Sequence, residues 1–483
     1  MNTPLRRLAT MALVMFLVLT GAATWVQVVQ APKLNNDARN ARVLYREFGS
    51  ARGPIVVGGT AVASSVRVDD PFNYQRIYAD GELYSAVTGF FSIANGRSQL
   101  ELAENDVLTG RGDQLFFSRV RDLLTGRSPE GAAVETTINA AAQQAARAGL
   151  GDQQGAVVAL DPTTGAILAD VSTPGFDPNV LAVHDTQAAA DAYRTLAAAE
   201  GNPLRPNTTM ERYPPGSTFK LVTAAAALES GAYAPDTMLA SPRTLTLPGT
   251  TATIQNFGGS SCGGDQVTLA QALRVSCNTA FAQLGMDLGD DAIRAQAEAF
   301  GFNEAGLTVP LDVVESVFPS DLGLPETAQS AIGQRDVQAT PMQMAMVAAA
   351  IANGGTLMRP YLVQTVRAAN LSVVSQAQPE VYRRPMTQAN AAALRDMMVG
   401  VVESGTGTAA RISGVTVAGK TGTAQTVEGQ APHAWFVAFA PAEAPRVAVA
   451  VMVEHGGSMG NEATGGAVAA PIARAVIQAV LGG

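Results

Sequence analysis

The segment Gly155-Ala-Val-Val-Ala-Leu-Asp-Pro-Thr-Thr-Gly-Ala-Ile-Leu-Ala169 contains two short apolar runs on either side of a strong turn signal. Two such runs around Asp-Pro-Thr-Thr-Gly predict a β-hairpin. Toward the C-terminus, residues 415–418, 435–440 and 446–453 have the pattern of three further strands, and residues 467–481 that of a closing helix. We therefore expect one sheet whose opening and closing strands meet and whose two faces are covered by helices.

The sequence before this hairpin divides into two parts at Val134. Residues 33–130 are polar and irregular, and turn pairs such as Gly58-Gly59 and Asn95-Gly96 separate short apolar stretches, which predicts a small strand-rich module. The alanine-rich stretch from Val134 to Leu150 predicts instead a helix and the start of a larger domain. The chain is thus predicted to be an α/β (α+β) multi-domain protein, divided into residues 1–31, 32–133 and 134–483.

An uncharged apolar run of 22 residues, Leu8–Val29, follows Arg6 and Arg7. This length is enough to cross a bilayer core, which needs about 20 residues. Two arginines before the run favour a cytoplasmic N-terminus and an extracytoplasmic remainder, so we expect a single-pass cell-membrane protein with its catalytic part outside. A cleaved signal peptide is the alternative, because residues 21–23 are small enough to serve a signal peptidase.

The charged residues of the chain are unevenly chosen. The 483 residues carry a net charge of -9, which argues against a nucleic-acid partner because phosphate binding needs a basic surface. Only three of the 32 Lys and Arg residues are lysine, namely Lys33, Lys220 and Lys420. Arginine suffices wherever a permanent cation is needed. Each lysine is therefore a candidate for a position that requires an amine able to lose its proton.

Ser217 and Lys220 lie three residues apart in Pro214-Pro-Gly-Ser-Thr-Phe-Lys220, at the predicted start of a buried helix over 220–230. Positions i and i+3 of a helix share a face, so the Lys220 amine is expected to reach the Ser217 hydroxyl. Serine needs a base, and a lysine whose pKa is lowered by burial or by another cation can act as one. Arginine cannot, because it does not lose its proton in proteins.

Lys420 begins Lys420-Thr-Gly-Thr423, directly after the predicted strand over 415–418. The backbone of such a strand can pair with an extended substrate, and Gly422 would let that substrate come close. The ammonium group of Lys420 would lower the pKa of Lys220 or bind a substrate carboxylate. The plainer interpretation, two surface lysines beside small residues, requires both motifs to arise by chance.

A third short motif, Ser276-Cys-Asn278, lies between these two, and alone it indicates only a helix or turn cap. Its middle residue, Cys277, and Cys262 are the two cysteines of the chain. In an exported protein they can form a disulfide, and two buried thiols are the alternative. With three scattered histidines they provide no metal-ligand spacing, so neither a metal site nor a cofactor is expected.

The order Ser-x-x-Lys, Ser-x-Asn and Lys-Thr-Gly resembles the established signature of penicillin-binding proteins and serine β-lactamases. The likeness extends to residues 155–178, 213–220, 404–407, 463–466 and 469–471. Residues 52–55 and 101–110 resemble the pedestal of class B penicillin-binding proteins. The resemblance covers nearly the whole chain. It implies the penicillin-binding transpeptidase fold, with an antiparallel sheet flanked by helices, a dimerisation-like pedestal and one transmembrane helix.

The same resemblance implies a peptidoglycan D,D-transpeptidase that acts in cell wall synthesis and cell division and is inhibited covalently by β-lactams. Ser217 would attack the penultimate D-alanyl carbonyl of a stem peptide, and Lys220 would take its proton. Ser276 would relay a proton to the departing D-alanine with the help of Lys220 and Lys420, and Asn278 would hydrogen-bond to the donor peptide. The terminal carboxylate would be held by Lys420, Thr421 and Thr423, with Gly422 leaving room on the strand. The backbone N–H groups of Ser217 and Thr423 would form the oxyanion hole.

The partners implied are stem peptides ending in D-Ala-D-Ala, β-lactams, a separate glycan polymerase of the SEDS family, and division or elongation proteins. No cofactor is implied. Hydrolysis is the main alternative, because D,D-carboxypeptidases and β-lactamases share the three motifs. A membrane-bound β-lactam sensor is less favoured, since only seven residues precede the single apolar run. The apolar run and the pedestal favour a transpeptidase, because a small secreted hydrolase has no use for them.

Overall fold

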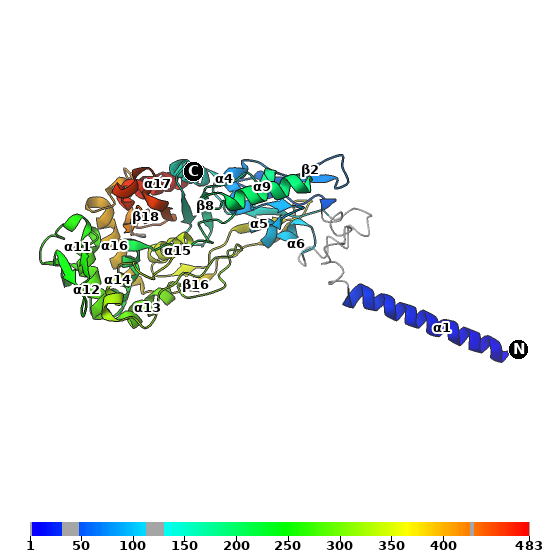
Figure 1. Cartoon of the computed structure of the whole chain (residues 1–483), viewed down its shortest axis with the longest axis horizontal. Coiled ribbons are helices and arrows are strands. Elements are labelled where there is room, and N and C mark those ends of the chain that lie inside the picture. Colours follow the sequence, from blue (N-terminus) through cyan, green and yellow to red (C-terminus); the bar gives the residue numbers. More distant parts are fainter. Residues whose placement is uncertain (1, 31–47, 113–129, 426–428, 483) are drawn as a thin grey trace. The chain divides into compact units, whose positions relative to one another are not determined.

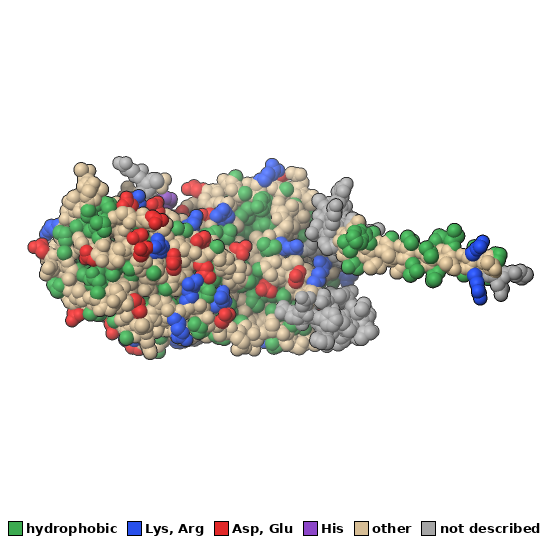
Figure 2. All heavy atoms as spheres, turned by 90° about the horizontal axis from the view of Figure 1, so that it is seen from below, with side chains coloured by type: hydrophobic (Ala, Val, Ile, Leu, Met, Phe, Trp, Pro, Cys, Tyr) green, Lys and Arg blue, Asp and Glu red, His purple; other side chains and the backbone are tan. Residues whose placement is uncertain are grey.

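The computed structural model describes residues 2–30, 48–112, 130–425 and 429–482. The chain forms two compact units: Met1–Ala51 with Val66–Gln75, and Arg52–Ser65 with Arg76–Gly483. The first unit contains helix α1 (Asn2–Thr24), which continues as a π-helical turn, η1 (Trp25–Val29). Figure 2 shows hydrophobic side chains along this helix and basic side chains near its beginning.

Two helical segments of the described residues are long and apolar enough to cross a membrane. Thr3–Val29 has 27 residues and no buried side chains, whereas Gly465–Gly482 has 18 residues and is half-buried in the second unit. The second segment therefore serves as a core helix. The first is compatible with the single-pass anchor that the sequence predicts.

The second unit is built on a five-stranded antiparallel sheet in the order β17-β18-β19-β7-β8. Its strands are β7 (Gly155–Leu160), β8 (Ile167–Thr173), β17 (Ala418–Ala424), β18 (His433–Ala440) and β19 (Val447–Val453). The predicted hairpin forms β7 and β8, and β7 pairs along its length with β19. The prediction that the opening and closing strands meet is confirmed.

Helices cover both faces of this sheet (Figure 1). Side chains alternate between the faces, so that Val157 and Phe436 belong to one apolar core and Val158 and Val437 to another. The first core is completed by α8 (Ala140–Leu150) and α17 (Ala470–Gly482), and the second includes α15 (Pro341–Ala352). The helix-sheet-helix arrangement predicted from the sequence is therefore present.

A second sheet has six strands in the order β15-β14-β6-β1-β2-β3. It joins β1 (Ile55–Val57), β2 (Thr60–Arg67), β3 (Tyr74–Tyr78) and β6 (Ala133–Thr136) to a hairpin from much later in the chain, β14 (Val363–Arg367) with β15 (Val373–Gln376). This return is not predictable from the sequence, because hydrophobic alternation indicates a strand without identifying its partner.

A buried ion-pair cluster organises the residues beside this sheet. Glu101 accepts hydrogen bonds from Nε of Arg52 at 2.5 Å and from Nε of Arg76 at 2.7 Å. Burial alone would raise the pKa of Glu101, but the two arginines hold it below its ordinary value. Arg76 also donates to the carbonyl oxygen of Gly53 at 2.8 Å. The cluster therefore links the chain before β1 to β3 and to helix α5 (Gln99–Ala103).

The remaining described elements are further helices and short strands, and these strands pair in four separate two-stranded sheets. The other helices are α4 (Gly81–Thr88), α6 (Asn105–Leu108), α9 (Thr186–Ala198), α10 (Lys220–Glu229), α11 (Leu269–Arg274), α12 (Asn278–Leu288), α13 (Asp290–Ala299), α14 (Leu324–Ser330) and α16 (Gln388–Ser404). Short strands are β4 (Phe91–Ser92), β5 (Gly96–Arg97), β9 (Met238–Ala240), β10 (Thr244–Thr246), β11 (Thr253–Gln255), β12 (Gln266–Thr268), β13 (Leu357–Met358) and β16 (Val381–Arg383).

Two predicted elements differ in the structure in ways that matter for the fold and the site. The helix expected over residues 134–150 begins only at Ala140, because Asn139 caps it and the β-branched residues before Asn139 form β6. The strand expected over 415–418 runs instead from Ala418 to Ala424, so Lys420 lies inside a strand and not after one. Its pairing with β18 over all seven residues explains the extension.

Asp170 is a fully buried carboxyl group in the middle of β8. Its backbone N–H and C=O are both bonded to the side chain of Gln143, at 2.9 and 2.7 Å. Neither carboxylate oxygen has a clear hydrogen-bond partner in the described part of the chain. Burial raises the pKa of Asp170 to about 7, although the nearby Thr208 side chain opposes this shift.

We predict that Asp170→Asn stabilises the protein at pH 8. The folded state keeps a proton on Asp170 that the unfolded chain loses near its ordinary pKa, so stability falls as the pH rises from about 4 to about 7, by up to about 4 kcal/mol. The uncharged amide removes this loss. Thermal unfolding at pH 5 and pH 8 measures the effect, with Asp152→Asn, at an exposed turn, as control. An unchanged difference between the two melting temperatures in Asp170→Asn would contradict the prediction.

Candidate active site

Ser217 lies in a short 3-10 helix, η4 (Gly216–Phe219), immediately before α10. The core holds this turn on its inner side, where the Phe219 ring stacks on Phe318 with 5.5 Å between ring centroids. The three residues after Ser217, up to and including Lys220, are fully buried, whereas Ser217 is only half-buried. The turn therefore leaves the serine accessible.

The glycine before Ser217 brings this turn against β17. Gly216 has a φ of +52°, in the left-handed region that favours glycine. A Cβ atom on Gly216 would lie 2.9 Å from the carbonyl oxygen of Thr423 and 3.0 Å from Cα of Ala424. The backbone of η4 thus packs directly on the end of β17, which brings Ser217 near Thr423.

Lys220 is the first residue of α10, and its side chain is completely buried. Its Nζ atom donates hydrogen bonds to Oδ1 of Asn278 at 2.7 Å and to the backbone oxygen of Ser276 at 2.9 Å. The Oγ atom of Ser276 lies 3.4 Å away. The amine also lies over the ring of Phe281, 5.5 Å from its centroid. This helix therefore directs the Lys220 amine at the Ser276-Cys-Asn278 motif.

Lys420 approaches the same serine from the sheet. Its side chain is fully buried, and Nζ donates to Oγ of Ser276 at 2.9 Å and to the backbone oxygen of Thr421 at 2.7 Å. Oγ of Ser276 is thus within hydrogen-bonding distance of both lysine amines. Three segments that are far apart in the sequence meet at this hydroxyl.

The electrostatics of the two amines favour proton transfer. Burial lowers the pKa of Lys220 well below its ordinary value, and the charge of Lys420 lowers it further. Burial also lowers the pKa of Lys420, to about 7. All their hydrogen-bond partners within the described residues are uncharged oxygens. At neutral pH one of these amines can therefore be unprotonated and act as a base.

Ser276 itself has an uncommon backbone conformation. Its φ of +59° is left-handed, which a non-glycine residue rarely adopts unless its surroundings enforce it. It lies between the end of α11 and the start of α12, where its own N–H donates to the Leu273 carbonyl at 3.1 Å. The N–H of Cys277 donates to the Ala272 carbonyl at 2.8 Å. These bonds hold the tight connection that carries Ser276 between the lysines.

Strand β17 lies at the edge of its sheet and pairs only with β18 among the described strands. Its other side therefore has backbone N–H and C=O groups with which an extended peptide can pair. Thr421 is buried and shares a hydrogen bond with Thr406, with 2.6 Å between their Oγ1 atoms. Thr423, two residues further along, is half-buried.

Gly422 allows a close contact within the protein that the sequence does not reveal. A Cβ atom on Gly422 would lie 2.9 Å from Cγ2 of Thr218, 2.9 Å from Cβ of Trp435 and 3.1 Å from the carbonyl oxygen of Pro215. That space is filled by the protein's own atoms. The glycine is therefore needed for the close packing of β17 on the turn that holds Ser217.

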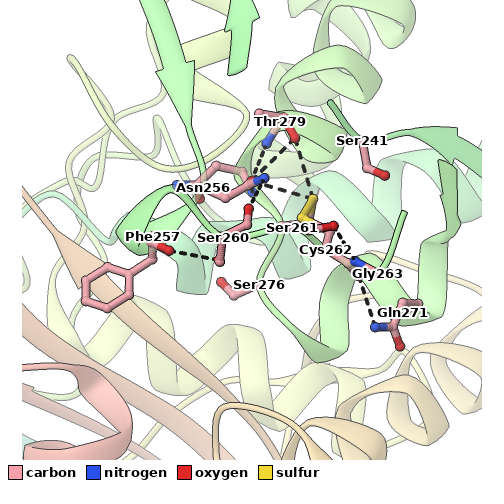
Figure 3. The surroundings of a disulfide bond; sticks show 12 residues. Ser241, Asn256, Phe257, Ser260, Ser261, Cys262, Gly263, Gln271, Ser276 and Thr279 are labelled. Atoms are coloured by element: carbon pink, nitrogen blue, oxygen red, sulfur yellow. Dashed lines mark hydrogen bonds between the residues drawn. A yellow bond between two sulfur atoms is a disulfide. The ribbon is translucent and has the colours of Figure 1, made fainter. Parts of the chain in front are cut away.

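Cys262 and Cys277 are joined in a disulfide (Figure 3), with 5.7 Å between their Cα atoms. The bond connects the loop after β11 to the Ser276-Cys-Asn278 motif. Asn256, in the same loop, accepts a hydrogen bond from the backbone N–H of Asn278 at 2.9 Å. The sequence does not single out Asn256, because an isolated asparagine in a glycine-rich stretch is typical of any loop.

A second polar group that the sequence does not single out supports the segment before Ser217. The hydroxyl of Tyr213 donates to Oε1 of Glu454 at 2.8 Å, and Nδ2 of Asn207 donates to the same oxygen at 3.2 Å. Burial raises the pKa of Glu454. Nothing in the sequence relates these residues, which are more than 240 positions apart from Glu454.

The structure thus joins four of the predicted site residues, Lys220, Ser276, Asn278 and Lys420, through hydrogen bonds. Ser217 is not among the hydrogen-bond partners of Lys220 in the described part of the chain. Positions i and i+3 are eclipsed in a 3-10 turn, so the two side chains remain on one side of it. No three His, Cys, Asp or Glu side chains of the described residues are grouped so that they could hold a metal ion.

Comparison with known families matches most of the chain. Residues 155–478 match the penicillin binding protein transpeptidase domain, and residues 52–134 match the penicillin binding protein A dimerisation domain. Two relatives are each named peptidoglycan D,D-transpeptidase PbpA. The one from Mycolicibacterium smegmatis is 46% identical over 490 residues, covering 100% of this chain and 99% of the relative. The one from Mycobacterium tuberculosis H37Rv is 44% identical over 495 residues, covering 100% of both chains.

Solved structures give a similar result. The ceftriaxone acyl-enzyme complex of penicillin-binding protein A from M. tuberculosis has a TM-score of 0.87 at 44% identity and covers 90% of this chain and 100% of that one. Its penicillin G acyl-enzyme complex has a TM-score of 0.84 at 43% identity, covering 89% and 100%. A D,D-transpeptidase domain from Eggerthella lenta has a TM-score of 0.77 at 37% identity, covering 90% and 99%.

We predict that Gly422→Ala destabilises the protein by about 1–3 kcal/mol, because the added methyl group forces β17 away from the turn that holds Ser217. Denaturant unfolding measures the change. Gly400→Ala is the control, since its Cβ would lie 3.9 Å from the nearest atom, Cδ of Arg274, within a helix that favours alanine. Equal stability of the Gly422→Ala variant and the native protein would contradict the packing role.

Proposed function

Because this chain belongs to the penicillin-binding protein transpeptidase family and is a serine-type peptidoglycan D,D-transpeptidase, we propose a role in that reaction for each residue of its site. The enzyme cross-links peptidoglycan stem peptides through a serine acyl-enzyme, and β-lactams inhibit it by acylation. The observation that carries the assignment is the meeting of two buried lysine amines at one serine hydroxyl.

We propose that Ser217 is the nucleophile and Lys220 its general base. The accessible position of Ser217 in η4 suits attack on a peptide carbonyl. The lowered pKa of Lys220 supports the base role, because an unprotonated amine can take the hydroxyl proton. Oγ of Ser217 forms a bond to the penultimate D-alanyl carbonyl carbon, and its proton moves to Nζ of Lys220.

Ser276 and Lys420 are assigned to the second proton transfer. As the tetrahedral intermediate collapses, the C–N bond to the terminal D-alanine breaks and its nitrogen needs a proton. Oγ of Ser276 lies between the two amines and is suited to relay a proton from Lys220. Oδ1 of Asn278 accepts a hydrogen bond from Lys220, and the amide can form a further hydrogen bond to the donor peptide.

Binding and oxyanion stabilisation are assigned to β17 and η4. Lys420, Thr421 and Thr423 would bind the terminal carboxylate of the peptide or of a β-lactam, and the open edge of β17 would pair with the donor backbone. The N–H groups of Ser217 and Thr423 would form the oxyanion hole, which the close packing of η4 on β17 supports. Gly422 permits that packing.

The acyl-enzyme then reacts with the second stem peptide. An acceptor amine attacks the ester carbonyl, a new C–N bond forms, and the bond to Oγ of Ser217 breaks. The amine proton returns through the lysines to Ser217, which restores the enzyme. This two-step exchange is ping-pong chemistry.

We also propose the division of the chain into an N-terminal stub with a transmembrane helix at 1–31, a pedestal at 32–133 and a transpeptidase domain at 134–483. The matched segments 52–134 and 155–478 support this division. Residues 31–47 and 113–129 lie outside the described residues. The apolar helix after Arg6 and Arg7 supports a cytoplasmic N-terminus and an extracytoplasmic catalytic part.

We predict that a fluorescent penicillin labels the native protein and fails to label Ser217→Ala. Lys220→Arg should be acylated at least a hundredfold more slowly, because arginine does not lose its proton and general-base catalysis contributes about 10²–10⁴. The native acylation rate should increase with pH and level off well below the ordinary lysine pKa, since the pKa of Lys220 is lowered. Mass spectrometry and gel fluorescence measure adduct and rate.

The lifetime of the adduct is the control for hydrolysis. An adduct that persists for many minutes agrees with a transpeptidase, whereas rapid turnover would indicate a β-lactamase. Native-rate acylation of the Lys220→Arg variant would refute the general-base assignment.

The membrane proposal predicts that protease added to spheroplasts removes the part of the chain after residue 31. Protection of that part would contradict the orientation.

Following the family resemblance, we propose a SEDS-family glycan polymerase and division or elongation proteins as partners. Co-purification from detergent-solubilised membranes should recover such a polymerase, and its consistent absence after cross-linking would count against this partner.

A further inference from the structure

We propose that Asn256 is a positioning residue for catalysis: together with the Cys262–Cys277 disulfide, it fixes Ser276 and Asn278 in the orientation that the two lysines require. The inference rests on the roles proposed above for Ser276 and Asn278. Asn256 lies in the loop between β11 and β12, its side chain is 5% exposed, and it contacts neither lysine in the described hydrogen-bond network.

Asn256 caps α12 from outside the helix. The N-cap residue of α12 is Cys277, whose sulfur is in the disulfide and provides no side-chain cap. Oδ1 of Asn256 accepts from the backbone N–H groups of Asn278 at 2.9 Å and Thr279 at 3.1 Å. Two of the N–H groups that a helix leaves unpaired at its start are thus satisfied by a residue some 20 positions earlier.

The same loop fixes the direction of the Asn278 amide. Nδ2 of Asn278 donates to the carbonyl oxygen of Gln255 at 2.9 Å, and Oδ1 accepts from Nζ of Lys220 at 2.7 Å. A reversed amide would place two donors at Lys220 and two acceptors at Gln255. The carbonyl of Gln255 therefore ensures that Asn278 presents its oxygen to the catalytic amine.

The loop is joined to the motif at one further point and is also closed on itself (Figure 3). The disulfide joins Cys262 to Cys277, the residue between Ser276 and Asn278. Nδ2 of Asn256 donates to the carbonyl of Ser260 at 3.2 Å, which closes the turn around Phe257. These restraints act on a segment in which Ser276 has a left-handed φ of +59°. A strained conformation persists only where its surroundings enforce it, and this loop is positioned to do so.

The test uses the full-length protein in detergent and a fluorescent penicillin. The dependence of the acylation rate on penicillin concentration separates non-covalent affinity from the acylation step. Asn256→Ala should lower the acylation rate constant about tenfold and change the affinity less than about twofold, because β17 and not the loop binds the carboxylate. Asn256→Asp keeps the acceptor oxygen but loses the Nδ2 donor to Ser260, so it should recover part of the rate.

Asp185→Ala is the matched control. Oδ1 of Asp185 also accepts from two N–H groups at the start of a helix, those of Gln187 and Ala188 at 3.0 Å each, but α9 contributes no residue to the site. Loss of the cap formed by Asp185 should leave the acylation rate unchanged. Rates are referred to the folded fraction at the assay temperature, so a loss of folded protein alone does not count as a slower reaction.

The disulfide gives an independent test. The fluorescent penicillin should also acylate the double variant Cys262→Ala with Cys277→Ala more slowly than the native protein. Combined with Asn256→Ala, the effects should be less than additive, because both changes release the same loop. Additive effects would overturn the view of the loop as one unit.

Native-rate acylation in Asn256→Ala, or an equal loss in Asp185→Ala, would overturn the role of Asn256. If instead the native protein formed no adduct at Ser217, the proposed function itself would fail. The two failures are therefore distinguishable.

Discussion

The structure depends on burying two amines beside a single hydroxyl group. Lys220 and Lys420 are both fully removed from solvent, and their described partners are uncharged oxygens. Such a pair opposes folding, because desolvation and mutual repulsion both disfavour the protonated forms. The same cost lowers the pKa of Lys220 and makes it a base. The chemistry therefore comes directly from an arrangement that a purely structural core would avoid.

This arrangement requires that three elements approach closely and stay fixed. Lys220 begins α10, Lys420 lies in β17, and Ser276 lies between α11 and α12. Glycines occupy the closest contacts: a Cβ atom on Gly333 would lie 2.1 Å from the carbonyl oxygen of Gly216, itself against β17. The Cys262–Cys277 disulfide and its loop restrain the third element. Backbone packing thus sets the distances between the reacting groups.

The three motifs, and the sheet that carries the third of them, could be predicted from the sequence, because each depends on local pattern or on residue chemistry. The hairpin around Asp161-Pro-Thr-Thr-Gly165 and the pairing of β7 with β19 are examples. Asn256 and the Tyr213–Glu454 bond could not be predicted, since both arise from tertiary contacts of common residue types. The sequence also does not show why position 422 is a glycine, because it does not show which atoms a Cβ atom at that position would contact.

The hairpin β14–β15 has a consequence for how the polypeptide is made. It joins the sheet of β1 and β6, although Val363 lies more than 200 residues after Thr136. During synthesis from the N-terminus, the first-made strands must therefore wait for the last third of the chain before their sheet is complete. Such late closure of a long loop slows folding and leaves β6 as an exposed edge meanwhile. A fragment ending near residue 133 would lack β14 and β15, so the pedestal is a poor candidate for independent expression.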